Sequence, residues 1–466
     1  MSKFKIALIQ LVLAFGFNLK AAQQQIYSDS VDGEIWTYSI SNGYACIACD
    51  IGASSAYLGK KTDVTIPTKL GGLEVKYIAP SAFGYKTISS LVIPEGVERV
   101  GSYAVRSSSL ESLSLPATLK YIGEKAFNSG YQSWIRGVSI TGVSDLVIED
   151  KAFYEMPLSS IGIEGTNISI GAEAFYHSDW VSMGAQDHGT ISLTGSGIVV
   201  APRAFYGMKY GFMNVDLSGV AEIGEDAFNS LGLNRIYAYS DSARDGGHGP
   251  GKVTVSGILG KVHPQAMYRA ALGDVFFDSL ESVFESPGWC SLTAGRNTWY
   301  SCLMSCGGKY IYELAIPSTV TEIPDYAWGS CKLYSLEIPL SVTNVGAYAF
   351  ANCGLTNVVV SDVEKITFND GCFAGNKIEA FTLPARMRRI PDEMFKDCGK
   401  LAKCAIPAGV EEIGPNAFYG CSLLEEVALP SSLTNVGPIS LAHASLVSNS
   451  TGIIFIGSKF VTVLGL

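Results

Sequence analysis

The sequence predicts a repeat solenoid, a right-handed coil of stacked turns, and three observations predict it. A block of the form [IV]-G-x-x-A-F occurs in recognisable variants fourteen times, as in the segments Ile122 to Phe127 and Val345 to Phe350. Most steps between copies are 22 or 23 residues. A second block, L-x-x-[LV]-x-[IL]-P, lies upstream of many copies. Such self-similarity is typical of a solenoid, because each unit buries its apolar face only against its neighbours.

The aromatic position that closes the first block, which we call the Phe slot, marks each turn of the coil. Glycine before it suits a tight bend, and the Ala-Phe pair places a small and a large side chain inside the coil. The Phe slot falls at Phe83, Val105, Phe127, Phe153, Phe175, Phe205, Phe228, Met267, Trp328, Phe350, Phe373, Phe395, Phe418 and Leu441.

The upstream block predicts a short strand in each turn. Leu91 and Ile93 alternate with period two, which indicates a strand with one face inward. Pro94 then ends the strand, because proline donates no ladder hydrogen bond and favours a turn. One strand per unit of about 22–23 residues predicts a parallel sheet along the molecule, mainly β structure joined by short turns or helical turns. The right-handed coil follows from the rule for parallel crossovers.

This combined pattern resembles the BspA-like leucine-rich repeat family, a group of bacterial and protist surface proteins. The resemblance covers about residues 64–441, most of the chain. The segment 32–43, DGEIWTYSISNG, also looks like the hairpin module that often precedes such arrays. The family resemblance implies a curved leucine-rich-repeat solenoid and, for several members, adhesion or protein binding. It carries no catalytic motif, so it implies no catalytic residue.

The expected organisation has four parts. Residues 1–22 form a signal peptide, residues 23–63 an N-terminal cap hairpin module, and residues 442–466 a C-terminal cap. The repeat array spans residues 64–441, with irregular insertions near 237–252 and 285–310. Caps are expected because an open terminal coil exposes both apolar core and a strand edge.

The N-terminus predicts export from the cytoplasm. Lys3 and Lys5 precede an apolar run over residues 6–17, and Ala21-Ala22 supply small residues for cleavage, which is the form of a secretory signal peptide. The apolar run is too short for a comfortable membrane span. A buried N-terminal strand is the alternative. We expect a secreted or cell-surface protein with no membrane span after signal removal.

Charge and histidine content argue against several functions. The formal net charge of -10 disfavours a nucleic-acid partner. Arg386, Arg388 and Arg389 form the only tight basic cluster, for which a solvated turn is the favoured interpretation. The five histidines are scattered, and the glycine-rich run 239–250 lacks the spacing of a calcium loop. We therefore expect no enzyme, no cofactor and no metal site.

Eleven cysteines in an exported chain raise the question of disulfides. Cys331, Cys353, Cys398 and Cys421 each lie three residues after the Phe slot, and Asn376 takes that place in the intervening unit. Stacking puts these residues in one column. The favoured interpretation is a column of small buried groups that satisfy the backbone, with disulfide bridges as the alternative.

Candidate ligand residues lie where the repeat is interrupted. The outward strand positions carry mostly small residues and hold no Trp, Tyr or Arg, the usual interface anchors. Between Phe228 and Trp328, steps of 39 and 61 residues replace the usual period, and this break is rich in aromatic residues. Inserted loops on a repeat scaffold commonly carry binding. The ligand-surface candidates are Phe276, Trp289, Trp299 and Tyr300. Core filling in a drifted coil is the alternative.

These observations favour an adhesin-like interaction protein that binds an extracellular protein or glycan. The second hypothesis is a passive structural spacer, or a scaffold of an extracellular layer, without a specific ligand. The plain strand faces favour the second hypothesis, and the aromatic break favours the first.

Overall fold

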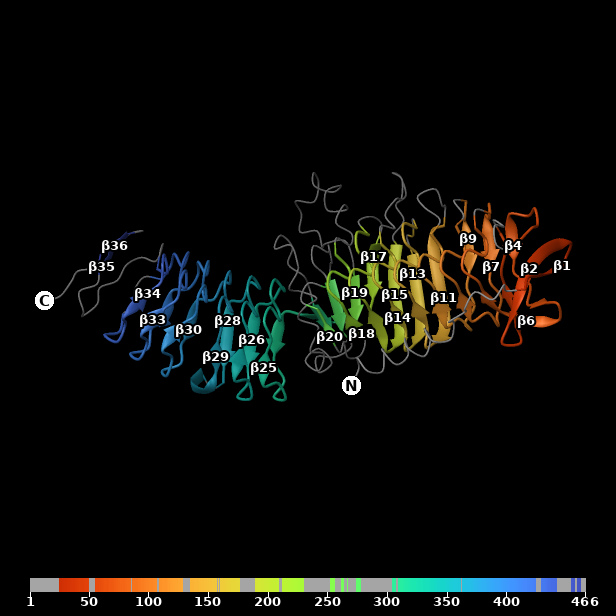
Figure 1. The fold of residues 1–466 in the computed structure, drawn as a ribbon. Helices are drawn as coiled ribbons and strands as arrows, with labels where there is room; N and C mark the ends of the chain where they lie inside the picture. The colour runs from red at the N-terminus through yellow and green to blue at the C-terminus, as the bar shows by residue number, and fades with distance from the viewer. Residues whose placement is uncertain are drawn as a thin grey trace.

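The protein is an elongated stack of coils (Figure 1). A computed structural model describes residues 25–49, 55–84, 86–106, 109–128, 135–156, 158, 160–176, 189–208, 212–229, 252–255, 261–263, 266, 274–277, 304–306, 309–361, 363–424, 429–441, 454–456 and 459–461. Strands of successive coils pair in parallel, so the predicted solenoid is confirmed. Within the described residues, the one helix is the short 3-10 helix η2 (Val363–Lys365), and no helix there has the length and apolar character to span a membrane.

Each coil contributes two strands rather than one. The first strand comes from the upstream block, as in β7 (Ser90–Val92). The second strand ends just before the glycine of the [IV]-G block, as in β8 (Arg99–Val100), which pairs in parallel with β10 (Tyr121–Ile122) of the next coil. The expectation of one strand per unit is therefore incomplete. Two-residue strands are too short to show an alternating pattern.

The second strands of the N-terminal half join the cap in one sheet, in the order β1-β2-β3-β6-β8-β10-β12-β14-β16-β18-β20, with β5 paired to β6. The remaining members of this sheet are β1 (Tyr27–Val31), β2 (Glu34–Ser41), β3 (Tyr44–Ile47), β5 (Lys69–Leu70), β6 (Leu73–Ile78), β12 (Val147–Ile148), β14 (Ser169–Ile170), β16 (Ile198–Val200), β18 (Val220–Ile223) and β20 (Lys261–Val262).

The N-terminal cap is an antiparallel meander joined to the array. Asp32-Gly33 and Asn42-Gly43 form its two turns, and all four residues have positive φ, as two-residue hairpin turns of type I′ require. β3 then pairs in parallel with β6 of the first coil. Trp36 packs against Tyr57 and against Phe83, with ring centroids 4.8 and 6.2 Å apart, so the cap covers the first ring of the core.

The first strands form separate sheets whose strand length depends on proline. Pro94 and Pro116 follow β7 and β9 (Ser112–Ser114), which have three residues each. Where threonine or glutamate replaces this proline, as at Thr141 and Glu164, the strands extend to eight and seven residues, because the backbone can continue its ladder. The two sheets are β4-β7-β9 and β11-β13-β15-β17-β19-β21-β22-β23. Their other members are β4 (Asp63–Thr65), β11 (Gly137–Ser144), β13 (Ser160–Thr166), β15 (Gly189–Ser196), β17 (Phe212–Asp216), β19 (Lys252–Val255), β21 (Asp274–Phe277), β22 (Met304–Cys306) and β23 (Lys309–Ile311).

The C-terminal array, with Phe slots from Trp328 to Leu441, contains shorter sheets: β24-β26-β28, β25-β27-β29, β30-β32 and β31-β33-β34. Its strands are β24 (Glu313–Ala315), β25 (Glu322–Ile323), β26 (Ser335–Ile338), β27 (Asn344–Val345), β28 (Asn357–Val360), β29 (Thr367–Phe368), β30 (Ala380–Thr382), β31 (Arg389–Ile390), β32 (Lys403–Ala405), β33 (Glu412–Ile413) and β34 (Asn435–Val436). Near the C-terminus, β35 (Ile454–Ile456) and β36 (Lys459–Val461) pair as a hairpin. The N-terminal array is the set of coils with Phe slots from Phe83 to Phe228.

The Phe slots form the core. Their aromatic side chains are fully buried at Phe83, Phe127, Phe153, Phe175, Phe205, Phe228, Trp328, Phe350, Phe373, Phe395 and Phe418. In the N-terminal array, successive rings from Phe127 to Phe228 lie 4.9–5.1 Å apart. From Phe350 to Phe418 in the C-terminal array they lie 5.6–6.1 Å apart.

The Cys/Asn column satisfies backbone groups, as predicted. The Sγ atoms of Cys353, Cys398 and Cys421 lie 3.0–3.2 Å from Phe-slot carbonyl oxygens of a preceding coil. Asn376 donates from Nδ2 to the carbonyls of Phe350 and Phe373 and accepts at Oδ1 from two backbone N–H groups. Cys331, Cys353, Cys398 and Cys421 form no disulfide, so the bridge alternative fails for this column.

Candidate binding surface

The four ligand-surface candidates of the sequence remain predictions. Phe276 belongs to β21, which pairs in parallel with β19, but its side chain lies outside the described part of the structure. Trp289, Trp299 and Tyr300 also lie outside the described residues. The structure therefore does not bring these four residues together or separate them.

Three tyrosines at the end of the same break form an exposed cluster, which we call the junction tyrosines: Tyr310, Tyr312 and Tyr334. Tyr310 lies in β23, whereas Tyr312 and Tyr334 directly precede β24 and β26. The rings of Tyr312 and Tyr334 stack with centroids 5.5 Å apart, and the Tyr310 ring lies 6.4 Å from that of Tyr312. Tyr310 and Tyr334 are 46% and 44% exposed.

The fold explains this placement. Tyr312 and Tyr334 occupy the same place in successive coils, so parallel pairing of β24 with β26 brings their rings together. The adjacent outward residues Glu313 and Glu337 are also exposed, which gives the cluster an acidic border. The aromatic break that the sequence indicates contains Tyr310 and Tyr312 but not Tyr334, which lies within a regular unit. Tyr334 could have been found from the recurrence of tyrosine at one repeat position, because Tyr312 occupies that position in the preceding coil.

A second set of tyrosines, in the N-terminal array, has its ring faces occupied. Tyr154, Tyr176 and Tyr206 stack in sequence with centroids 5.2 and 5.6 Å apart. The Arg203 guanidinium lies 4.6 Å from the Tyr206 ring centroid, and Lys151 lies 5.7 Å from that of Tyr154. Cations over these rings leave mainly ring edges for a ligand. This set therefore presents less aromatic area than the junction tyrosines.

The outward strand faces are plain, as expected from the sequence. Ser112 donates a hydrogen bond to Ser90 over 2.8 Å, so small polar side chains on this face also bond to one another. The sheet of first strands is interrupted between β28 and β30, which do not pair, and a groove of about 490 Å³ lies between these two strands. Val358 and Val360 are partly exposed there, whereas the equivalent residues Leu336 and Ile338 are fully buried.

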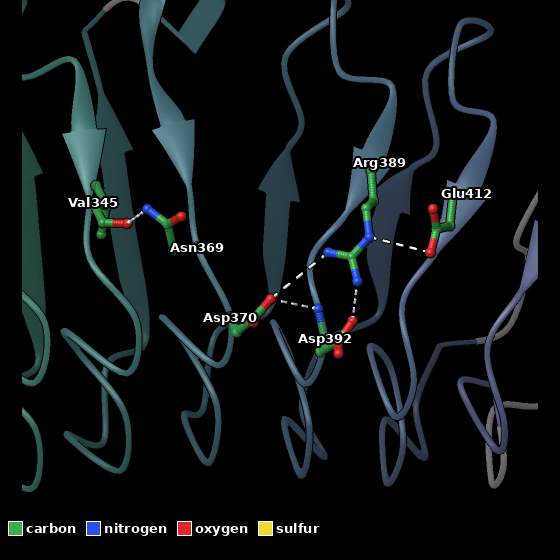
Figure 2. Close-up of polar contacts among 6 residues, drawn as sticks. All are labelled: Val345, Asn369, Asp370, Arg389, Asp392 and Glu412. Carbon is green, nitrogen blue, oxygen red and sulfur yellow. Dashed lines mark hydrogen bonds and ion pairs between the residues drawn. The ribbon is translucent and has the colours of Figure 1, made fainter.

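The three arginines of the basic cluster are all exposed, as a solvated segment predicts, but Arg389 also lies at the centre of an ion-pair network that joins neighbouring coils (Figure 2). Arg389 pairs with Asp392 in its own coil, with Glu412 in the next coil at 3.2 Å, and with Asp370 in the preceding coil at 3.8 Å. Asp370 also accepts a hydrogen bond from the Asp392 N–H at 3.0 Å. Three carboxylates thus surround one guanidinium, so this cation is engaged within the protein.

The buried thiols are chemically quiet. Burial raises the pKa of Cys398 and of Cys404 to about 12, and burial likewise raises the pKa of the Cys372 thiol. These groups stay protonated at neutral pH and are poor nucleophiles. Within the described residues, no group of three or more His, Cys, Asp or Glu side chains is placed to hold a metal ion.

Comparison with known proteins identifies the repeat. A family model described as BspA type leucine rich repeat region matches in six copies over residues 51–182, 302–402 and 364–455, together more than half of the chain. No curated protein matches the chain. A leucine rich cell surface protein from Faecalibacterium prausnitzii is similar at 20% identity, over 92% of this chain and 95% of that chain, with a TM-score of 0.37. A leucine-rich repeat protein from Bacteroides ovatus is similar at 16% identity, over 89% and 94%, with a TM-score of 0.40.

Proposed function

Because the chain belongs to the BspA type leucine-rich repeat family, we propose that it is a secreted or cell-surface interaction protein that binds an extracellular protein or glycan. Its role in this proposal is that of an adhesin-like module. The proposal assigns no catalytic activity, since the five histidines recur at no defined spacing with a nucleophile or an acid.

The junction tyrosines carry this proposal. Tyrosine supplies a large, rigid contact area at a low cost in side-chain entropy, and it is enriched among the residues that dominate binding energy. Tyr310 and Tyr334 expose close to half of their surface, although buried aromatic residues fill the core of every neighbouring coil. The rings of Tyr310 and Tyr334 both lie against the partly exposed ring of Tyr312, and together the three offer a contact surface that a single exposed tyrosine does not.

The location in this proposal is supported by the N-terminal segment. Lys3 and Lys5, the apolar run 6–17 and Ala21-Ala22 have the form of a secretory signal peptide. Expression of the full chain in a secreting host should yield a mature protein that begins at Gln23, as N-terminal sequencing or intact mass would show. Retention of residues 1–22 in the exported protein would contradict the assignment.

Binding is tested with the purified chain 23–466 against a panel of extracellular matrix proteins and glycans. A saturable ligand is expected, and Tyr334→Ala or Tyr310→Ala should weaken it by about 2 kcal/mol, roughly thirtyfold. Tyr326→Ala is the matched control, because Tyr326 is 43% exposed and stacks on Tyr348 at 5.4 Å elsewhere in the same array. Equal loss of affinity in the control and the junction variants would remove the junction tyrosines from the site.

The alternative is a passive spacer or scaffold of an extracellular layer. The plain strand faces favour it, because serine pairs such as Ser90 and Ser112 bond to each other at the surface. The absence of any saturable ligand in the panel would support this alternative over the adhesin-like role.

A further inference from the structure

The N-terminal cap closes only part of the first coil. It extends the sheet of second strands, because β3 pairs with β6, and it covers the Phe slot through Trp36. It does not extend the sheet of first strands. There the order is β4-β7-β9, so among the residues that the structure describes β4 has a partner on one side only.

The direction of the unpaired backbone groups follows from the pairing of β4 with β7. Ser90 N–H donates to the Thr62 carbonyl at 3.2 Å, and Ile66 N–H donates to the Val92 carbonyl at 3.0 Å. Groups that face one neighbour alternate along a parallel strand, so the N–H and C=O groups of Asp63 and Thr65 face away from β7. A row of such groups is a template for another strand.

A groove of about 230 Å³ runs along this edge of β4. Trp36 and Tyr57, which are almost fully buried, contribute apolar surface to its lining. Asp32, Glu34 and Asp63 add three carboxylates, against the single cation of Lys61.

Glu34 is held in place as a carboxylate. It accepts hydrogen bonds from the Tyr57 hydroxyl at 2.7 Å and from the Lys60 N–H at 3.0 Å. These bonds and the nearby Lys61 ammonium lower the pKa of Glu34, with the Tyr57 bond as the largest cause. The groove therefore keeps its negative charge at neutral pH.

We propose that the free edge of β4 binds an extended basic peptide of a partner protein, which adds to the sheet as a further strand. Main-chain hydrogen bonds to Asp63 and Thr65 supply the pairing, and alternate side chains supply the specificity. Asp63 and Thr65 are exposed and Val64 is buried, so the outward side chains of the peptide meet carboxylates and the inward ones meet the apolar lining. A peptide that alternates lysine and valine matches this pattern. The partner class differs from that of the junction tyrosines and rests on separate residues.

The test uses the chain 23–466 and four capped pentapeptides in calorimetric titrations: Lys-Val-Lys-Val-Lys, the same peptide with N-methylated backbone at both valines, Glu-Val-Glu-Val-Glu, and Ser-Val-Ser-Val-Ser. Saturable binding is expected for the first peptide, with at least a tenfold weaker affinity for the other three. Equal binding of the N-methylated peptide would show simple ionic attraction and overturn strand addition. Equal binding of the glutamate or serine peptide would overturn the role of the carboxylates.

Two variants of the protein separate backbone pairing from charge. Thr65→Pro removes an N–H that faces the groove and leaves the ladder to β7 intact, since proline is tolerated where the N–H of an edge strand faces solvent. This substitution should weaken the affinity for the lysine peptide about tenfold. Asp63→Lys should weaken the affinity for the lysine peptide by a similar factor and should reduce the salt dependence of binding. Ala408→Pro, at the first central position of an exposed turn in the C-terminal array, controls for general effects of proline, because proline is favoured at that position of a turn.

Further outcomes would overturn strand addition at β4. No binding of any peptide, or unchanged affinity in Thr65→Pro with its unfolding midpoint preserved, would overturn the proposal. A concentration-dependent dimer of the free protein that Thr65→Pro abolishes would show that a second copy of the chain occupies the edge, and would replace the peptide. None of these results bears on whether the junction tyrosines bind an extracellular protein or glycan, which the panel tests separately.

Discussion

The N-terminal and C-terminal arrays are built from one repeat, but their coils stack differently. From Phe153 to Phe228, successive Phe-slot rings are inclined by only 1–4° and spaced at 4.9–5.0 Å. From Phe350 to Phe418 they are inclined by 11–20° and spaced at 5.6–6.1 Å. Paired strands lie about 4.8 Å apart. The rings from Phe153 to Phe228 therefore stack almost face to face at strand spacing, whereas those of the C-terminal array are more inclined and farther apart. Phe127 and Phe153, at the start of the N-terminal stack, are inclined by 13° at 5.1 Å.

Strand length accounts for the difference. In the part of the N-terminal array that contains β11, β13 and β15, first strands of seven or eight residues and the second strands hold both sides of the coils at strand spacing. In the C-terminal array, Pro339, Pro384 and Pro407 follow the first strands, and the sheets have two or three members. Shorter ladders constrain the coils less. We infer that the residue after the first strand affects how the Phe-slot rings stack as well as where the strand ends.

The largest expected effect comes from removing a Phe-slot ring in each array. Phe175→Ala should cost about 5 kcal/mol and Phe373→Ala about 3 kcal/mol, because the cost rises with the cavity that remains. Phe175 is held between rings at 5.0 Å on both sides, whereas Phe373 also touches Phe368 and Phe381, which can move into the space. Denaturant unfolding measures the difference.

Phe175→Leu and Phe373→Leu are the matched controls, and each should recover most of the loss. Because coils are coupled mainly to nearest neighbours, hydrogen exchange should rise near the mutated coil. Phe350→Ala should likewise raise hydrogen exchange near its own coil, and it should lower the free energy of unfolding by about 3–5 kcal/mol. Equal loosening at both distant ends of the molecule would contradict this local coupling.

Proline placed at two equivalent positions tests the role of strand length. Glu164 lies inside β13, and the bond from the Ser160 N–H to the Arg136 carbonyl sets the alternation by which the Glu164 N–H faces the paired strand β11. Glu164→Pro removes this donor and should cost about 3 kcal/mol. Thr141 lies in the register shift between Ile140 and Val143, so Thr141→Pro should cost about 1 kcal/mol or less. Thermal unfolding of the two variants compares them directly. Similar losses would show that the ladder beyond the first strand contributes little.

Alkaline pH should loosen the C-terminal array first. Burial raises the pKa of Cys398 to about 12, whereas an unfolded cysteine titrates near about 8.5. Its contribution is complete below the unfolded pKa and is lost as pH rises through the folded pKa, so about 2 kcal/mol should be lost by pH 10. Hydrogen exchange at pH 7 and pH 10, corrected for intrinsic rates, measures it. Cys398→Ser should remove this part of the pH dependence, and an unchanged pH profile would contradict the assignment.

The smallest effect is expected at the ion-pair network of the C-terminal array. Arg389→Ala should cost about 1 kcal/mol or less, because its partners are 37–50% exposed and solvent screens them. The loss should shrink in 1 M salt. Arg388→Ala is the control, since this side chain is 69% exposed and should contribute little. A loss at Arg389 that does not respond to salt would mean that packing dominates there.

Periodicity made the fold predictable, and local detail limited the prediction. The repeat located every described Phe slot, including Val105, and the spacing of Cys353 and Asn376 predicted their column. The second strands were missed because two residues carry no alternation. The unpaired edge between β28 and β30 was also missed, since it depends on how Phe381 packs beside Phe368.

The candidate surface was less predictable for a physical reason. The sequence pointed to the break before Trp328, and Tyr310 and Tyr312 do lie there. Tyr334 belongs to the same cluster because parallel pairing stacks equivalent positions, which is a property of the coil rather than of local composition. The free edge of β4 could not be predicted, because the sequence indicates a cap but not which of the two sheets of the first coil the cap extends.

The hydrogen bonds that join each coil to the next have a mechanical consequence. Backbone bonds such as Phe175 N–H to the Ala204 carbonyl, and Phe395 N–H to the Ala417 carbonyl, link one turn to its neighbour only. A tensile load on the two ends therefore passes through all coil boundaries in series, and the boundaries can give way one at a time. A released coil of about 22 residues adds roughly 75 Å of extended chain. The molecule can lengthen in small increments under tension while the coils that remain keep their shape.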